Sequence, residues 1–111
     1  MEFIRKPLLR VLADIQAERE RQILQEGWTH EHDDTHQRGE LARTAAAYAV
    51  NASYNDKTQA TRKKHGQPPH AWPLKWDWTW WKPKDRRRDL VRAAALIVAE
   101  IERLDRGGVV R

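Results

Sequence analysis

The residues best suited to chemistry are concentrated between Trp72 and Arg88, where five of the six tryptophans stand beside six basic residues. Indole rings stack on flat aromatic ligands, and lysine and arginine contact phosphate oxygens. The combination is typical of sites for nucleotides or single-stranded nucleic acid. The stacking candidates are Trp28, Trp78, Trp80 and Trp81, and the phosphate candidates are Lys82, Lys84, Arg86, Arg87 and Arg88.

Two features of this segment leave its role open. Arg86, Arg87 and Arg88 are expected in the first turn of a helix, where the helix dipole disfavours cations. A bound anion would offset that cost, and so would pairing with Asp85, Asp89 or other carboxylates. The tryptophans, for their part, can pack over the open end of a helical bundle instead of facing a ligand.

A second cluster of polar side chains lies between Glu26 and Glu40 and holds three histidines in seven residues. On a helix His36 and Glu40 are one turn apart on the same face, with Asp33 near them, so a divalent-metal site is geometrically possible. The spacing matches no established zinc motif. Capping hydrogen bonds explain Asp33 and Asp34 without any metal.

Acidic residues scattered over the expected helices permit an enzymatic alternative. Nucleoside-triphosphate pyrophosphatases of the MazG type are all-helical and gather four acidic residues around magnesium, but their Glu-Glu-x-x-Glu element is absent here. A metal-dependent hydrolase built on this chain would use Asp33, His36 and Glu40 with Asp89, and it would need Mg²⁺ or Mn²⁺.

Other catalytic chemistries are excluded by composition. The chain has no cysteine, which removes disulfides, thiolate metal sites and cysteine nucleophiles. Ser53 is the only serine and no elbow glycines surround it, and no glycine-rich phosphate loop occurs. We therefore expect a binding module that uses no cofactor, rather than an enzyme.

The length and charge of the chain bound its class. With 111 residues it is expected to form one domain, residues 1–111, around a single core. A net charge of +5 favours anionic partners. No apolar run is long enough to cross a bilayer, and the first residues become charged too early for a signal peptide. The expected location is the cytoplasm, with no membrane partner.

These side chains must be positioned by helices, because the apolar residues recur at three- and four-residue steps. The pattern predicts one helix from Phe3 to about Glu26 that stops at Gly27, and a second that Asp33 or Asp34 caps and that runs to about Ala52. Residues 51–73 are expected to form a long loop with a short helical turn at Thr58 to Lys64. The predicted fold is an all-α bundle of three to four helices.

The last helix is expected to begin after a cap at Asp85 and to end at Gly107 and Gly108. Its apolar positions extend around so much of the helix circumference that we expect the helix to be mostly buried, either in the bundle or against another subunit. Because a chain of this size buries limited area alone, a homodimer is expected. The positions on its main apolar face are Leu90, Ala93, Ala94, Ile97, Ile101 and Leu104.

The segment from Glu18 to Thr29, with Asp33 and Asp34, resembles the RyR domain, a small helical module of ryanodine receptors that also occurs in bacterial and phage proteins. The shared features are an arginine-led Gly-Trp-Thr element after a helix, an acidic turn, and a final helix introduced by basic residues, to which Lys84 to Leu96 is similar. The His-Pro and Val-Pro-Tyr portion of the module is missing here. The resemblance implies binding of adenine nucleotides between aromatic side chains.

Nearly the whole chain also resembles uncharacterised phage and prophage proteins that pair a Glu-Gly-Trp-Thr-x-Glu-His-Asp-Asp motif with a Trp-Trp-Lys-Pro and Arg-Arg-Asp-Leu-Val ending. That resemblance implies a viral or mobile-element origin, where small accessory proteins often counter host defence, and it implies no particular activity. Our leading expectation is therefore a phage-type binding protein that sequesters a nucleotide-derived or other phosphate-bearing ligand. A second alternative is an inhibitor that docks on a host defence protein.

Overall fold

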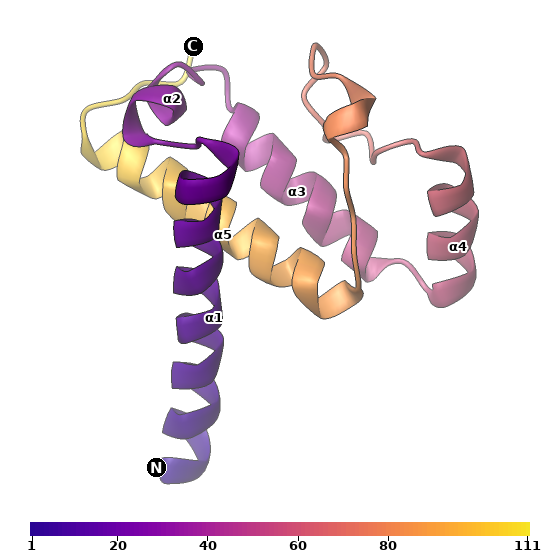
Figure 1. Ribbon diagram of the computed structural model, residues 1–111, viewed down its shortest axis with the longest axis horizontal. Coiled ribbons are helices and arrows are strands. Elements are labelled where there is room, and N and C mark those ends of the chain that lie inside the picture. Colours follow the sequence, from indigo (N-terminus) through magenta and orange to yellow (C-terminus); the bar gives the residue numbers. More distant parts are fainter.

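The computed structural model describes residues 1–111 and is built from helices alone, which confirms the predicted all-α class. Three long helices pack together, and a shorter helix and an irregular segment lie to one side (Figure 1). None of the helices is long and apolar enough to cross a membrane. The elements are α1 (Glu2–Glu26), α2 (His30–Asp34), α3 (Glu40–Ser53), α4 (Asp56–His65), the 3-10 turn η1 (Trp78–Trp80) and α5 (Arg86–Asp105).

Helix α1 confirms the predicted first helix at both ends. It stops at Gly27, whose φ of 72° lies in the left-handed region that glycine adopts without strain. The C-terminal half of α1 packs on α5, whereas its N-terminal half extends away from the rest of the molecule (Figure 1). The part of α1 nearest Gly27 is therefore the part that can contribute to a site.

The predicted second helix is interrupted, and the prediction that Asp33 or Asp34 caps it is wrong. The chain forms a single turn, α2, that is capped by the Thr29 hydroxyl, and α3 begins only at Glu40. Between them Gly39 takes a φ of 78°, a left-handed conformation that no continuous helix contains. The interruption turns α2 against α5 and lets α3 run in its own direction.

The predicted loop over residues 51–73 is also wrong in its position. Helix α3 continues to Ser53, and the helical turn predicted at Thr58 to Lys64 is confirmed as part of the longer α4, which Asn55 caps and Gly66 ends. No residue of α4 is buried, so it carries none of the apolar periodicity from which a helix is recognised. The irregular segment instead runs from Gly66 to Asp85 and is broken only by η1.

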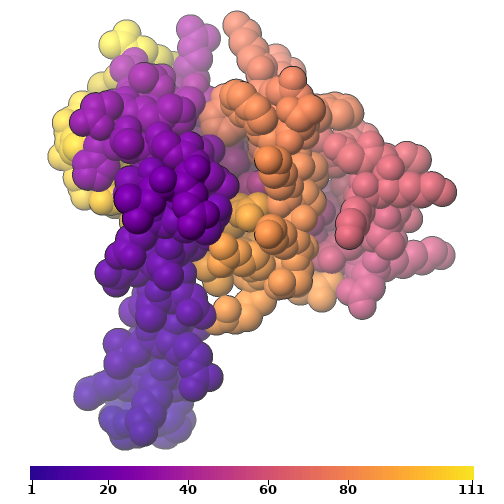
Figure 2. Space-filling model, viewed as in Figure 1, coloured from indigo at the N-terminus to yellow at the C-terminus, as the bar shows by residue number.

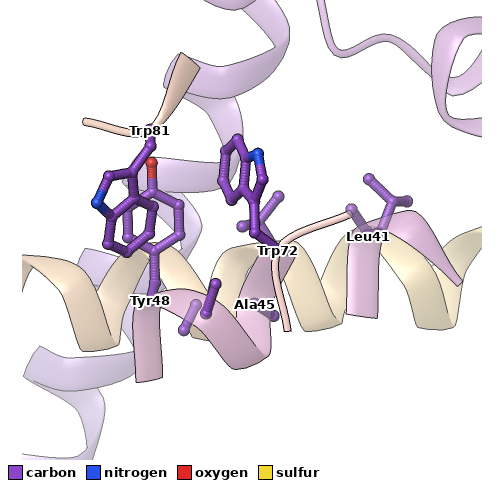
Figure 3. Close-up of a cluster of buried hydrophobic side chains, with 9 residues drawn as sticks. Leu41, Ala45, Tyr48, Trp72 and Trp81 are labelled. Carbon is purple, nitrogen blue, oxygen red and sulfur yellow. The ribbon is translucent and has the colours of Figure 1, made fainter. Parts of the chain in front are cut away.

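The core lies between α3 and α5, which form the most extensive helix contact of the molecule. Alanines on both helices let the two backbones approach closely, and aromatic side chains from the irregular segment cover the contact (Figure 3). Asp85 caps α5 through the Arg88 amide at 2.8 Å, as predicted. The core residues are Leu41, Ala45, Ala47, Tyr48, Trp72, Trp81, Ala93, Leu96 and Ala99.

The apolar face predicted to be buried on α5 is only partly so. Val91, Ala95 and Ala99 are buried on the sides of α5 that meet its neighbours. The larger residues Leu90 and Ile97 remain about half exposed, at 48% and 49%. Two neighbouring helices occupy two sides of α5, and small residues suit those contacts, so the third side, with its bulky side chains, faces solvent.

The close approach of α3 and α5 predicts the effect of enlarging an alanine between them. Ala45→Leu is expected to lower the free energy of unfolding by about 1–3 kcal/mol, because a filled contact must open to admit the added methyl groups. Ala42→Leu, at an exposed position on the same helix, should change it by less than about 0.5 kcal/mol. Urea denaturation of both variants measures the difference, and equal effects would contradict this packing.

Candidate functional site

An open cleft of about 740 Å³ lies between the C-terminal half of α1 and the segment that runs from Trp72 to Lys84. In Figure 2 it lies between the indigo helix and the orange segment. Helices α3 and α5 contribute its floor through Tyr48 and Leu96. The cleft is lined by Arg21, Gln22, Gln25, Glu26, Trp28, His32, His36, Thr44, Tyr48, Trp72, Lys75, Trp76, Trp80, Lys82, Lys84, Arg88, Arg92 and Leu96.

One wall of the cleft is a continuous cluster of indole rings centred on Trp76. The Trp76 ring centroid lies 5.8 Å from that of Trp28, 5.7 Å from that of Trp72 and 5.7 Å from that of Trp80. All three pairs meet edge to face, at interplanar angles between 69° and 83°. In each pair the edge of one ring meets the face of the other, and Trp80, at 59%, keeps the largest exposed fraction of the three rings around Trp76.

The inner end of the aromatic cluster belongs to the core. Trp81 is 9% exposed and packs on Tyr48 at a centroid distance of 4.6 Å, and Trp72 lies beside both (Figure 3). The Arg92 guanidinium lies 4.9 Å from the centre of the Tyr48 ring, an arrangement that attracts the cation to the ring. Trp81 is thus a buried support of the wall and not a cleft residue.

Of the four predicted stacking residues, Trp28 and Trp80 line the cleft and Trp78 does not. Trp78 and Trp80 lie two residues apart in the turn η1 and are exposed to similar extents, 55% and 59%, but only Trp80 lines the cleft. The wall also contains Trp76 and Trp72, which were not singled out from the sequence.

The remaining lining of the cleft is mainly positively charged, and we call its lysine and arginine side chains the basic wall. Six cationic side chains line the cleft and Glu26 is the only carboxylate among the lining residues. Three of the cations, Lys82, Lys84 and Arg88, were predicted from the sequence. The others are Arg21, Lys75 and Arg92. A concave surface with this excess of positive charge raises the local concentration of anions.

The remaining two predicted phosphate contacts, Arg86 and Arg87, lie outside the cleft. Arg86 donates to the Ala52 carbonyl at 2.9 Å and to Asp56 at 3.0 Å, and so it holds the C-terminal end of α3. Arg87 pairs with Asp14 of α1 at 2.7 Å. Carboxylates from other helices therefore offset the cost of placing arginines in the first turn of α5, the alternative that the sequence left open.

The basic wall is organised by Glu18, a carboxylate that is only 1% exposed. It accepts hydrogen bonds from Arg21 at 2.8 Å, from Arg88 at 2.7 Å and from Gln22 at 3.0 Å. Burial by itself would raise the pKa of Glu18, but the hydrogen bond from Arg21 and the charges of Arg21, Arg88 and Arg92 outweigh burial and lower it. Glu18 is therefore ionised, and it holds cations from two helices at the cleft.

The three residues of the metal hypothesis do not form a ligand set. The Asp33 carboxylate is fully buried and accepts a hydrogen bond from Arg19 at 2.8 Å. His36 Nδ1 lies 3.5 Å from a Glu40 carboxylate oxygen, so those two residues do meet, as their spacing predicted. No group of three or more histidine, aspartate or glutamate side chains in residues 1–111 is arranged to hold a metal ion.

Three polar atoms on the cleft wall are buried without a hydrogen-bond partner: Gln22 Oε1, His36 Nε2 and Arg92 Nε. The Gln22 amide nitrogen donates to Glu18, which can only accept, so the free atom is the amide oxygen. An unpaired buried polar atom costs about 1–3 kcal/mol. A ligand would recover that free energy only if these side chains moved so that the buried atoms reached the surface of the cleft.

Gln22 and Arg92, which line the cleft, and Glu18, which holds its arginines, join Trp72, Trp76, Arg21 and Lys75 among the residues that sequence reasoning did not assign to a ligand site. A signal for two of them was present, because Glu18 and Gln22 continue the three- and four-residue steps of the apolar stripe that runs through Val11 and Ile15. A charged or amide residue at a position where the pattern demands an apolar one indicates a buried polar contact. Arg92 likewise lies one turn after Arg88, on the same face of α5.

Searches against models of known families, curated proteins and solved structures find no match to this chain. The resemblances to the RyR domain and to phage proteins stay predictions from the sequence. Function is therefore inferred from the cleft.

The position of His36 predicts a pH dependence of stability. Burial lowers the pKa of His36 below its ordinary 6.5, the nearby His32 adds to this, and Glu40 opposes it. The folded state thus favours neutral His36, so its contribution to stability is complete above pH 6.5 and is lost as the pH falls from there through the lower pKa of the folded state. Urea denaturation at pH 7.5 and pH 5.5 should show a smaller loss in His36→Gln than in the unmodified chain. His65→Gln, at an exposed site on α4, should leave the loss unchanged.

Proposed function

We propose that the cleft binds a nucleotide-derived or other phosphate-bearing ligand, with the tryptophan wall stacking on its flat ring and the basic wall contacting its phosphate. The observation that carries this proposal is the meeting of the two walls in one open cleft, with six cations against one carboxylate. Aromatic rings stack on the base of a nucleotide and cations contact its phosphate, and the cleft offers both kinds of side chain.

The phosphate end is assigned to the α5 side of the cleft. Arg88 and Arg92 project from successive turns of α5, and Lys82 and Lys84 come from the segment that leads into it. Arginine can contact two phosphate oxygens at once through its planar guanidinium group. Glu18 neutralises part of this charge and restrains Arg88, and restrained side chains lose less entropy when a ligand binds.

The ring end is assigned to Trp28, Trp76 and Trp80. Trp80 presents the most exposed ring of the three, and Trp76 behind it is held by three neighbouring indoles. Base stacking on an aromatic side chain contributes about 1–3 kcal/mol for each base. It distinguishes poorly between bases, because every base has a flat face.

Discrimination between bases is assigned to Gln22 and His36. Gln22 Oε1 is a buried acceptor without a partner, and neutral His36, with Nδ1 directed at Glu40, has a second one at Nε2, and each side chain would have to move to bring its acceptor to the cleft surface. Both atoms suit a ligand edge that carries N–H donors, such as the amino group of adenine, guanine or cytosine. A ligand without a donor there would leave both atoms unpaired.

In the cell, such a protein would act by holding its ligand rather than by converting it. The resemblance to phage proteins supports a role in sequestering a host nucleotide signal, and the same resemblance supports the alternative of docking on a host defence protein. The other alternative, a MazG-like hydrolase that uses Mg²⁺ or Mn²⁺, gains no support from Asp33, His36 and Glu40, because they do not form a metal-ligand set. The binding proposal is preferred because the cleft offers direct contacts for a ligand.

Binding can be measured from the fluorescence of the tryptophans that line the cleft. Titration with a panel of mono-, di-, tri- and cyclic nucleotides is expected to quench the signal with half-saturation below about 100 μM for at least one member, an affinity of about −5 kcal/mol. Arg88→Ala should weaken that binding by about tenfold or more, because a charged hydrogen bond is lost. Trp80→Ala should weaken it by a similar factor.

The chain offers a matched control for each variant. Arg87→Ala removes the neighbouring arginine of the same helical turn, and Trp78→Ala removes an indole of similar exposure in the same turn η1, but neither residue lines the cleft. Both controls should bind as the unmodified chain does. No quenching by any nucleotide would overturn the proposal, and nucleotide turnover upon addition of Mg²⁺ or Mn²⁺ would favour the hydrolase.

A further inference from the structure

The single chain exposes more surface than a folded monomer of its size normally does. Its accessible area is 7738 Å², whereas a monomeric protein of 13.1 kDa is expected to expose about 6,400 Å². Its radius of gyration is 14.8 Å, compared with about 13 Å for a compact domain of this length. The single chain therefore exposes about 1,300 Å² more accessible surface than a compact monomer of the same mass.

Much of the excess comes from the N-terminal half of α1, which extends beyond its contact with α5 (Figure 1). Ile4, Leu8, Val11 and Leu12 there are between 41% and 52% exposed. They occupy the same helix face as Glu18 and Gln22, which is the face that α5 covers further along. One face of α1 is thus covered in its second half and bare in its first.

A second bare apolar stripe runs along α5, where Leu90, Ile97, Ile101 and Leu104 are between 43% and 52% exposed. It begins one turn after Arg87, whose ion pair with Asp14 marks the point at which α1 leaves α5. Leu12 precedes Asp14 by two residues and Leu90 follows Arg87 by three, so one end of each stripe lies near that pair. We call the eight residues together the α1–α5 apolar surface: Ile4, Leu8, Val11, Leu12, Leu90, Ile97, Ile101 and Leu104.

We propose that the α1–α5 apolar surface is the contact between two copies of this chain. A standard protein interface buries about 800 Å² on each partner, and the excess area of one chain is larger than that. Contiguous apolar patches of more than a few hundred Å² mark association sites on soluble proteins. Two copies that are related by a twofold axis each present the same stripes, so that both bare faces are covered in a closed pair.

The proposed contact leaves the cleft open. None of the eight residues lines the cleft, and α5 presents Arg88, Arg92 and Leu96 to the cleft from a different side of the helix. Association and ligand binding therefore use separate surfaces. A variant that breaks the pair should keep its nucleotide affinity within about twofold, because distant sites behave independently.

Sedimentation equilibrium of the full chain tests the proposal directly. The expected mass is twice the 13.1 kDa of one chain, over a concentration series up to about 100 μM, where a dimer with a Kd of about 1 μM is nearly complete. The double variant Leu8→Glu/Leu12→Glu should sediment as a single chain, because the dimer would bury four uncompensated carboxylates. Its helical circular dichroism should match that of the unmodified chain.

A matched control lies on the same helix. Leu24 is 82% exposed on the opposite face of α1, so Leu24→Glu should leave the dimer intact. The second double variant, Ile97→Glu/Ile101→Glu, tests the α5 stripe independently and should also give a single chain. A single-chain mass for the unmodified protein would overturn the proposal and indicate a different partner for the surface. A dimer that persisted in both double variants would place the contact elsewhere and would overturn it equally.

Discussion

Glu18 lies almost fully buried where α1 meets α5, and a carboxylate in that position stays charged only if cations and donors surround it. Arg21 and Gln22 supply two of the contacts from α1, and Arg88 supplies the third from α5. The hydrogen bonds that stabilise the buried Glu18 carboxylate therefore join the two helices. The same arginines line the cleft, so the contact that holds the fold together also positions the charge that would meet a ligand.

The aromatic wall is tied to the fold in a comparable way. Trp72 and Trp81 belong to the core over α3 and α5, and Trp76 and Trp80 continue the same cluster outward to the cleft. The irregular segment that carries them is therefore anchored by its own side chains although it has little secondary structure. A wall built in this way is preorganised, which reduces the entropy that ligand binding would cost.

Helix α5 serves three surfaces with its twenty residues. One side packs alanines against α3, a second presents Arg88 and Arg92 to α1 and the cleft, and the third is bare and apolar. The first two are occupied within one chain, which explains why the third remains. A helix that is apolar around most of its circumference is suited to burial on every side, and a single chain covers only part of α5.

The sequence by itself determined the all-α class, the bounds of α1 and α5, and five of the cleft residues, because periodicity, caps and clusters of tryptophan and basic residues are local properties of the chain. The five are Trp28, Trp80, Lys82, Lys84 and Arg88. Only the tertiary structure decided which arginine of α5 lines the cleft, that Trp78 lies outside it, that Gln22 belongs to it, and that Glu18 holds Arg21 and Arg88 beside it. Each of those outcomes depends on what a distant helix offers at that position. Burial and ion pairing depend on contacts between residues that are far apart in the sequence. A local sequence pattern does not identify the distant residue that makes the contact.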